Sequence, residues 1–361
     1  MTMQVRRSPV GLMLAALAGA ISACAPTALE PDDVTHLVRL ASARALLPAS
    51  AVMSRGVFDQ LHPLTVVDEP DALWSALSVV GVRADPCFIE GAAGASCRPQ
   101  LRLVLQPVME GRGGLTTRDA AVHLFFEVRG DELLEAVETL ATARQRSGVE
   151  SAAWRSTLRT TVERLVENGQ RSKVTQMSVH ASNEAWIFGG FTLDGSTLTA
   201  VPIPTLGKLE HHVTSTGGTS RLSATLIPGS MMEPAFSNAA AGKGPAEDAR
   251  ASLDRLESPD AHNPGTVDCG GCHLASTARW HWSTPERRAG IDPSFADTRN
   301  LRALGYFFDR PAVSPRTRLE TAASLRTAPS LTLTVARASV CVFGTIAQKA
   351  RCHGSTSPRP A

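Results

Sequence analysis

Five consecutive residues constrain the possible fold of this chain more than any other part of its sequence. They are Cys269, Gly270, Gly271, Cys272 and His273. The two thiols are separated by two residues, so they lie on one turn of the chain, and an imidazole directly follows the second thiol. Glycine at both intervening positions allows a tight turn and adds no bulk beside the sulfurs. Any fold of this segment has to accommodate two sulfurs and an imidazole in one small region.

This C-x-x-C-H pattern is the attachment signature of a c-type haem. Two thiols at this spacing can add to the two vinyl groups of one porphyrin, and the adjacent imidazole can then bind the iron as its proximal ligand. The sequence therefore predicts one covalently bound haem c. Cys269 and Cys272 would form the thioethers, and His273 would be the proximal ligand.

Two other interpretations of the same residues stay open. A bare C-x-x-C can be a redox dithiol or a structural disulfide, although no thioredoxin-like βαβ pattern surrounds it here. Cys269, Cys272 and His273 could instead contribute to a zinc site. Against zinc, an adjacent cysteine and histidine do not easily point at one tetrahedral ion, and a second C-x-x-C is absent from the sequence.

The segment resembles cytochromes c, many of which use a methionine several tens of residues after the motif as the sixth iron ligand. This chain has no methionine after Met232. The distal candidates are therefore His281, which follows His273 by eight residues and stands between two tryptophans, and His262, which precedes the motif. Met231, Met232 and His353 are candidates further away in the sequence. An open sixth position is the alternative, and it would allow a peroxidase-type activity. The aromatic residues that could line a haem pocket in this half are Phe295, Tyr306, Phe307 and Phe308.

The N-terminus predicts export. Arg6 and Arg7 precede an apolar run, 10–21, that is too short to cross a bilayer but is typical of a secretory signal. The sequence Ile-Ser-Ala-Cys ending at Cys24 resembles the lipobox of bacterial lipoproteins. This resemblance implies that residues 1–23 are removed and that Cys24 carries the lipid that anchors the chain to a bilayer. Ala25 favours the outer membrane, with the protein facing the periplasm.

The remaining cysteines fit an oxidising compartment. Cys87 and Cys97 flank a glycine-rich loop that can turn back on itself, so we predict a disulfide between them. The closed loop is short, and such a bridge would contribute about 2–3 kcal/mol of stability.

The order of helical and strand patterns predicts an α+β fold. Strands and helices segregate along residues 24–240 rather than alternating strictly. A boundary near residue 240 separates this α+β domain of unknown role from a small, mainly α, cytochrome c-like region, 241–320. Residues 321–361 carry no acidic residue and no helical periodicity, which indicates a basic tail that could be disordered. The predicted helices are 31–47, 69–82, 131–144, 151–167 and 245–256, and the predicted strands are 101–108, 120–128, 173–180, 185–192, 197–202 and 220–227.

Charge and motifs exclude several functions. Without the signal, basic and acidic residues balance, so electrostatics gives no reason to expect nucleic acid as a partner. The chain contains no P-loop, G-x-G-x-x-G, G-x-S-x-G or H-E-x-x-H motif. As a whole it resembles bacterial lipoproteins that carry a single C-x-x-C-H late in a long α+β chain. We expect a membrane-anchored periplasmic protein that transfers electrons or senses through its haem, with an unidentified redox or envelope protein as partner. The alternative is a non-haem envelope binding module in which C-x-x-C-H is a disulfide or metal site.

Overall fold

The computed structural model describes residues 29–65, 68–91, 96–180, 185–214, 246–288 and 290–327. These residues belong to one compact unit. The predicted signal, Cys24 and the predicted strand 220–227 lie outside the described residues.

The described residues form helices and strands in the following order. The helical segments are α2 (Pro31–Val34), α3 (Leu40–Leu46), η2 (Ala49–Ala51), α4 (Arg55–Phe58), α5 (Pro70–Ala76), α6 (Gly130–Ser147), α7 (Ala152–Asn168), α9 (Ala246–Glu257), α10 (Cys269–Trp282), η4 (Pro285–Arg288), η5 (Pro293–Ala296) and α11 (Pro315–Thr327). The strands are β1 (Thr35–Leu37), β2 (Leu77–Phe88), β3 (Arg98–Gly111), β4 (Gly114–Thr117), β5 (Ala121–Glu127), β6 (Gln170–His180), β7 (Ala185–Asp194), β8 (Thr197–Val201), β9 (Glu210–Thr214), β10 (Leu304–Phe307) and β11 (Arg310–Val313).

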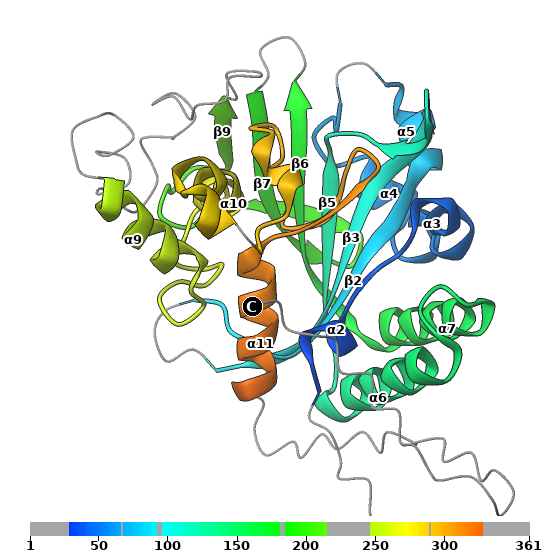
Figure 1. Ribbon diagram of the computed structural model, residues 1–361. Helices are drawn as coiled ribbons and strands as arrows, with labels where there is room; N and C mark the ends of the chain where they lie inside the picture. Colours follow the sequence, from blue (N-terminus) through cyan, green and yellow to red (C-terminus); the bar gives the residue numbers. More distant parts are fainter. Residues whose placement is uncertain are drawn as a thin grey trace, which may run out of the picture. The chain divides into compact units, whose positions relative to one another are not determined.

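A large antiparallel sheet organises the part of the chain that the structure describes. Within that part it has nine strands, with the order β1-β2-β3-β5-β6-β7-β8, while β4 pairs with β3 and β9 pairs with β7 (Figure 1). The strands β10 and β11 form a separate hairpin. Helices and antiparallel strands are segregated, so the α+β prediction is confirmed for the sheet and its helices.

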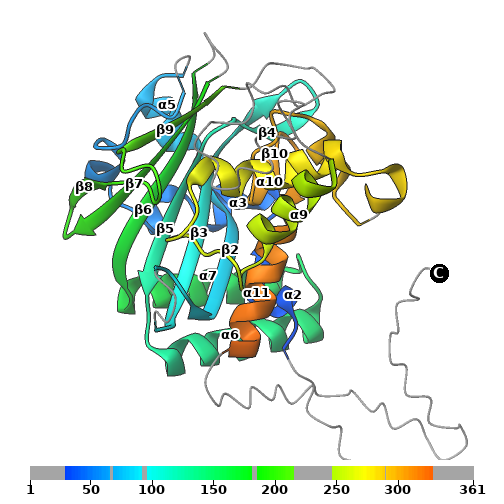
Figure 2. The ribbon, with the colours of Figure 1, turned by 90° about the vertical axis from the view of Figure 1, so that its left-hand side faces the viewer.

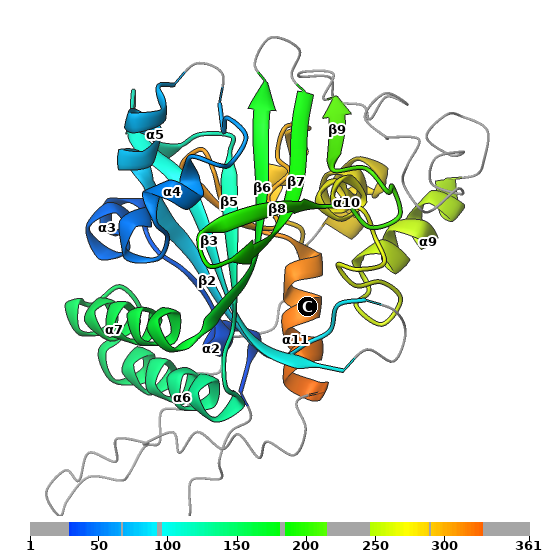
Figure 3. The ribbon, with the colours of Figure 1, turned by 180° about the vertical axis from the view of Figure 1, so that it is seen from behind.

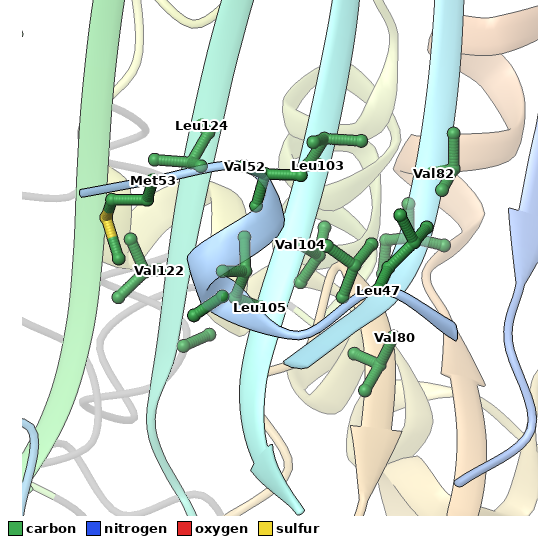
Figure 4. Close-up of a cluster of buried hydrophobic side chains, with 14 of the residues drawn as sticks. Leu47, Val52, Met53, Val80, Val82, Leu103, Val104, Leu105, Val122 and Leu124 are labelled. Carbon is green, nitrogen blue, oxygen red and sulfur yellow. The ribbon is translucent and has the colours of Figure 1, made fainter. Parts of the chain in front are cut away.

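One face of the sheet carries the main hydrophobic core. Leu103 of β3 pairs with Leu124 of β5, and Leu105 pairs with Val122, so these side chains share a face. Figure 4 shows them beside Val52, which follows η2. All are buried. On this side of the molecule α3 packs against α7, and Figure 3 shows both helices from behind.

The opposite face of the sheet is covered by the C-terminal part of the described chain. The helix α11 packs against β2, α10 packs against β9, and the β10–β11 hairpin packs against β2 and β3 (Figure 2). Gly81 of β2 provides room for this hairpin, because a β-carbon there would lie 3.1 Å from Leu304 Cγ. Gln106 of β3 holds the hairpin through both amide atoms: Oε1 accepts from the Tyr306 N–H at 2.7 Å, and Nε2 donates to the Tyr306 carbonyl at 2.9 Å.

The predicted helix 31–47 is wrong, because the structure divides it into α2, β1 and α3. Val34 and Val38 are four residues apart and both buried, which produces a helical spacing in the sequence. Between them, however, β1 pairs antiparallel with β2, with His36 opposite Val82. Pairing with the edge of the sheet therefore overrides the local pattern.

The predicted helix 69–82 is correct only in its first half. It ends at Ala76, and Leu77 begins the strand β2. All residues of β2 are buried, because the strand is covered on both faces. A strand buried on both faces loses the alternation of apolar and polar residues that identifies most strands.

The prediction of a tail from residue 321 is also wrong for its first residues, because α11 continues to Thr327. The buried side of this helix includes Arg316, Thr321 and Ser324, and these polar residues give no apolar periodicity. Residues 328–361 lie outside the described chain, as does the predicted boundary at 240. The described residues on both sides of that boundary belong to the same compact unit.

Candidate functional site

The C-x-x-C-H residues form the first turn of α10. Asp268 is the N-cap residue, and its Oδ1 accepts a hydrogen bond from the Gly271 N–H at 2.6 Å. Such a cap satisfies one of the backbone donors that a helix leaves free at its start. Residues 269 and 272 are three apart on the helix, so their side chains share a face.

Gly270 docks this turn against the sheet. Its N–H donates to His211 Nδ1 in β9 at 3.1 Å, and a β-carbon at this position would lie 2.4 Å from His211 Cε1. Glycine is therefore required by the close approach of helix and strand, a role that the sequence did not indicate. His211 itself is buried and holds the motif, whereas its neighbour His212 is exposed and contacts Glu210.

A cavity of about 300 Å³ lies between α10 and the sheet. Cys269, Cys272 and His273 all line it, so the structure brings together the three residues that the motif predicts. The walls also come from β3, β5, β6, β7 and α11. The main contributors besides the motif are Phe88, Arg102, His123, Phe125, Lys173, Met177, Phe188, Gly189, Gly190, Arg316 and Glu320.

Strand alternation in β5 places a histidine in this cavity. Val122, Leu124 and Phe126 point to the hydrophobic core, so His123 and Phe125 point to the opposite face. His123 and Phe125 both line the cavity. The sequence pattern does not single out His123, although it is the one polar side chain among the first six residues of this strand.

His123 and His273 are neighbours in the cavity, and their ring planes are nearly parallel. Their centroids are 6.2 Å apart, and the angle between the ring planes is 15°. Each ring is held at Nδ1: that of His273 is 2.7 Å from the carbonyl oxygen of Leu301, and that of His123 is 3.3 Å from Oγ1 of Thr175. Burial lowers the pKa of His273 to about 4 and that of His123 well below its usual value, so both rings are neutral at pH 7.

A network of buried charged side chains reaches the cavity wall through Arg102, Arg316 and Glu320. Arg83 contacts Asp85 at 2.6 Å and Glu320 at 2.9 Å, and Arg316 contacts Glu320 at 2.8 Å. Burial alone would raise the pKa of Glu320, but the surrounding arginines, led by Arg316, lower it to about 2. Arg102 adds a further positive charge, so the three arginines exceed the two carboxylates by one.

Arg102 is the least satisfied member of this network. Its guanidinium lies over the rings of Phe88 and Phe125, 4.9 and 5.0 Å from their centroids. Its Nε and Nη2 have no hydrogen-bond partner, and the nearest carboxylate oxygen, in Asp85, is 3.9 Å away. Burial, followed by repulsion from Arg83, lowers the pKa of Arg102. A buried cation with unused donors in a cavity wall is suited to an anionic group of a ligand.

The two thiols of the motif are not activated. Burial raises the pKa of Cys269 to about 12, and it also raises the pKa of Cys272, against the opposing effect of Arg316. Redox-active C-x-x-C pairs have lowered thiol pKa values, so this environment differs from that of a dithiol. Within the described residues, no group of three or more His, Cys, Asp or Glu side chains is arranged to hold a metal ion.

The structure does not bring the two predicted distal histidines to the cavity. His281 is on the same helix as His273, about 12 Å further along its axis, and its Nε2 contacts the carbonyl oxygen of Ala296 at 3.1 Å. His262 lines a separate, smaller cavity of about 70 Å³. Met231 and Met232 lie outside the described residues. The aromatic wall comes from the sheet and not from the aromatic residues that the sequence indicated, Phe295, Tyr306, Phe307 and Phe308.

Cys87 and Cys97 lie next to each other as free thiols. Burial, together with a hydrogen bond that the Cys87 thiol donates to Cys97, raises the pKa of Cys87 to about 12. The spatial proximity agrees with the predicted pairing, and the disulfide itself stays a prediction.

The chain matches no family model, no curated protein and no solved structure. In the residues that the structure describes, no helix combines the length and apolar character needed to cross a membrane.

Proposed function

We propose that this protein binds one c-type haem covalently in the cavity between α10 and the sheet, and that it transfers electrons or senses redox state through this haem. One observation carries the proposal: Cys269, Cys272 and His273 line the same cavity. Because haem c attachment needs two thiols and an imidazole at one pocket, this convergence is what the C-x-x-C-H interpretation requires.

The residues present fit the chemical groups of a haem. Each thiol would add across one vinyl group, forming a carbon–sulfur bond while its proton goes to the other vinyl carbon, with no net oxidation or reduction. The Nδ1 of His273 contacts a backbone carbonyl, an arrangement that fixes the ring and leaves Nε2 for the iron. When bound, the haem supplies a centre that gains and loses one electron.

The residues that line the cavity suit the rest of the porphyrin. Phe88, Phe125 and Phe188 offer apolar surface for its edges. Arg102, with its unused donors, is suited to a propionate. Gly189 and Gly190 stand side by side in β7 at the cavity wall. Glycines within a strand often mark a place where a ligand approaches the backbone closely.

Anchoring at a membrane is the second part of the proposal. It rests on the resemblance of residues 21–24 to a lipobox, with lipid attached to Cys24 after removal of residues 1–23. The protein would then be held in the cell envelope by the bilayer, facing the periplasm and a redox or envelope protein partner. Labelling with a radioactive or alkyne-bearing fatty acid tests this part: wild type should be labelled, and Cys24→Ala should not.

Covalent haem is tested by producing the full chain in a periplasm that has the cytochrome-maturation machinery. The protein should show a Soret band that survives acid–acetone extraction, since thioether-bound haem stays with the polypeptide. Cys269→Ala/Cys272→Ala should lose this band, whereas Cys87→Ala, a matched cysteine outside the cavity, should keep it. A colourless wild-type protein would contradict the proposal and favour the non-haem binding module.

A further inference from the structure

The cavity wall opposite α10 contains a second imidazole, that of His123, close to His273. The ring centroids of His123 and His273 are 6.2 Å apart, with ring planes inclined by 15°. Two imidazoles bound through Nε2 to opposite sides of one metal ion have centroids separated by roughly 6 Å, from two metal–nitrogen bonds of about 2 Å each and the distances from nitrogen to ring centre. The centroid separation of His123 and His273 matches this value, and their nearly parallel planes are compatible with two rings that approach one iron end-on.

The hydrogen bonds of the two rings have the same pattern. Nδ1 of His273 contacts the Leu301 carbonyl, and Nδ1 of His123 contacts Thr175 Oγ1. In each ring Nε2 is the remaining nitrogen, and among the described residues it has no hydrogen-bond partner. Metal-bound histidines commonly engage their second nitrogen in this way, which sets the tautomer and the orientation of the ring.

We propose that His123 is the sixth ligand of the iron, on the side of the haem opposite His273. This inference rests on the proposed function, because it requires a haem held by the C-x-x-C-H residues. It replaces His281 and His262 as distal candidates, and it leaves no open coordination position. The site would therefore serve electron transfer or redox sensing, and not peroxidase chemistry.

Other donors in the cavity are less suited to the iron. The sulfur of Met177 lies 3.6 Å from Nη1 of the buried Arg302, which donates to it. Lys173 is paired with Glu90. Among the described residues, neither a hydrogen-bond donor nor an ion-pair partner occupies Nε2 of His123. Its backbone is also fixed, because β5 is paired on both sides, with β3 and with β6.

The test uses the full chain with its covalent haem and reads the spin state of the iron. Wild type should be low-spin in both oxidation states, and the ferrous form should bind carbon monoxide slowly or not at all. His123→Ala should retain the covalent haem, become high-spin and bind carbon monoxide readily, and added imidazole should restore the low-spin spectrum. His281→Ala should behave like wild type.

His123→Met is a second variant, which tests the inference even where His123→Ala does not fold. His123→Met should stay low-spin and have a raised reduction potential, because a thioether sulfur replaces one imidazole. A high-spin wild type that binds carbon monoxide at once would overturn the inference, as would a His123→Ala or His123→Met protein with the wild-type spectrum and potential. Absence of covalent haem from wild type is a separate result, which contradicts the proposed function itself.

Discussion

The N–H of Gly270 donates a hydrogen bond to Nδ1 of His211 at 3.1 Å, and a β-carbon at residue 270 would lie 2.4 Å from the same ring. This contact joins the first turn of α10 to β9 and thereby sets the position of both thiols. Gly270→Ala should destabilise the fold by about 1–3 kcal/mol, since overpacking displaces helix or strand. Urea denaturation measures the loss.

The control for this change is Gly271→Ala. A β-carbon at residue 271 would meet Val267 Cγ2 at 3.3 Å, a distance that a small adjustment relieves. Its cost should therefore be lower than that of Gly270→Ala. Replacing His211 by Ala should reduce the cost of Gly270→Ala, because the obstructing ring is removed; strictly additive effects of the two substitutions would contradict this explanation.

Stability should depend on pH through His36. This ring is buried against Trp154, and burial lowers its pKa from 6.5 to about 4. Below pH 6.5 the unfolded chain gains a proton that the folded chain does not, so stability falls as the pH decreases from 6.5 towards 4. The shift corresponds to about 3 kcal/mol. His36→Phe keeps a ring in place and removes the titration.

The prediction for His36 is tested by measuring the free energy of unfolding of wild type and of His36→Phe, each at pH 7 and at pH 4.5. Other buried histidines titrate in both proteins, so the difference between the two isolates residue 36. Wild type should lose more stability than the variant over this range. Equal losses would mean that His36 is protonated similarly in the folded and unfolded states.

Glu320 should be among the most sensitive positions outside the apolar core. It contacts Arg83 and Arg316, which are both almost fully buried. Glu320→Gln leaves two buried cations short of a carboxylate and should cost about 3–5 kcal/mol. Glu163→Gln is the matched control. Glu163 pairs with Arg159 on an exposed helix face, so its loss should cost less than about 1 kcal/mol. Similar midpoints of denaturation for the two variants would refute the role of Glu320.

Arg102 should tune the reduction potential of the proposed haem. A cation near the iron disfavours the more positive ferric state, so Arg102→Gln should lower the reduction potential, on the order of 50 mV for a charge at this range in a partly polar site. The fold should persist, because Asp85 keeps its closer partner Arg83 at 2.6 Å. Redox titration gives the potential, and an unchanged value would place Arg102 away from the haem.

Sequence and structure agree best where the pattern is local. The C-x-x-C-H spacing predicts that Cys269, Cys272 and His273 lie close together, and the first turn of α10 places all three at one cavity. Long helices with clear periodicity, α6 and α7, were also predicted. The segment around β1 and the whole of β2 were not, because their state depends on pairing with distant strands.

The opposite wall of the cavity could not be derived from the sequence. His123 lies far from the motif along the chain, and only the order of the sheet brings it to His273. Arg316 and Thr321 on α11 were missed for a different reason: their buried faces are polar, so the helix gives no apolar pattern. The two tryptophans beside His281 favour it as a distal ligand in the sequence, whereas the helix that contains it carries it away from the cavity.

The most direct measurement is the mass of the peptide that contains residues 269–273, after proteolysis of the full chain matured in a periplasm that attaches haem c. That peptide should carry the mass of one haem, linked to both Cys269 and Cys272, in the wild-type protein. A peptide of unmodified mass with two free or disulfide-bonded cysteines would contradict the central claim.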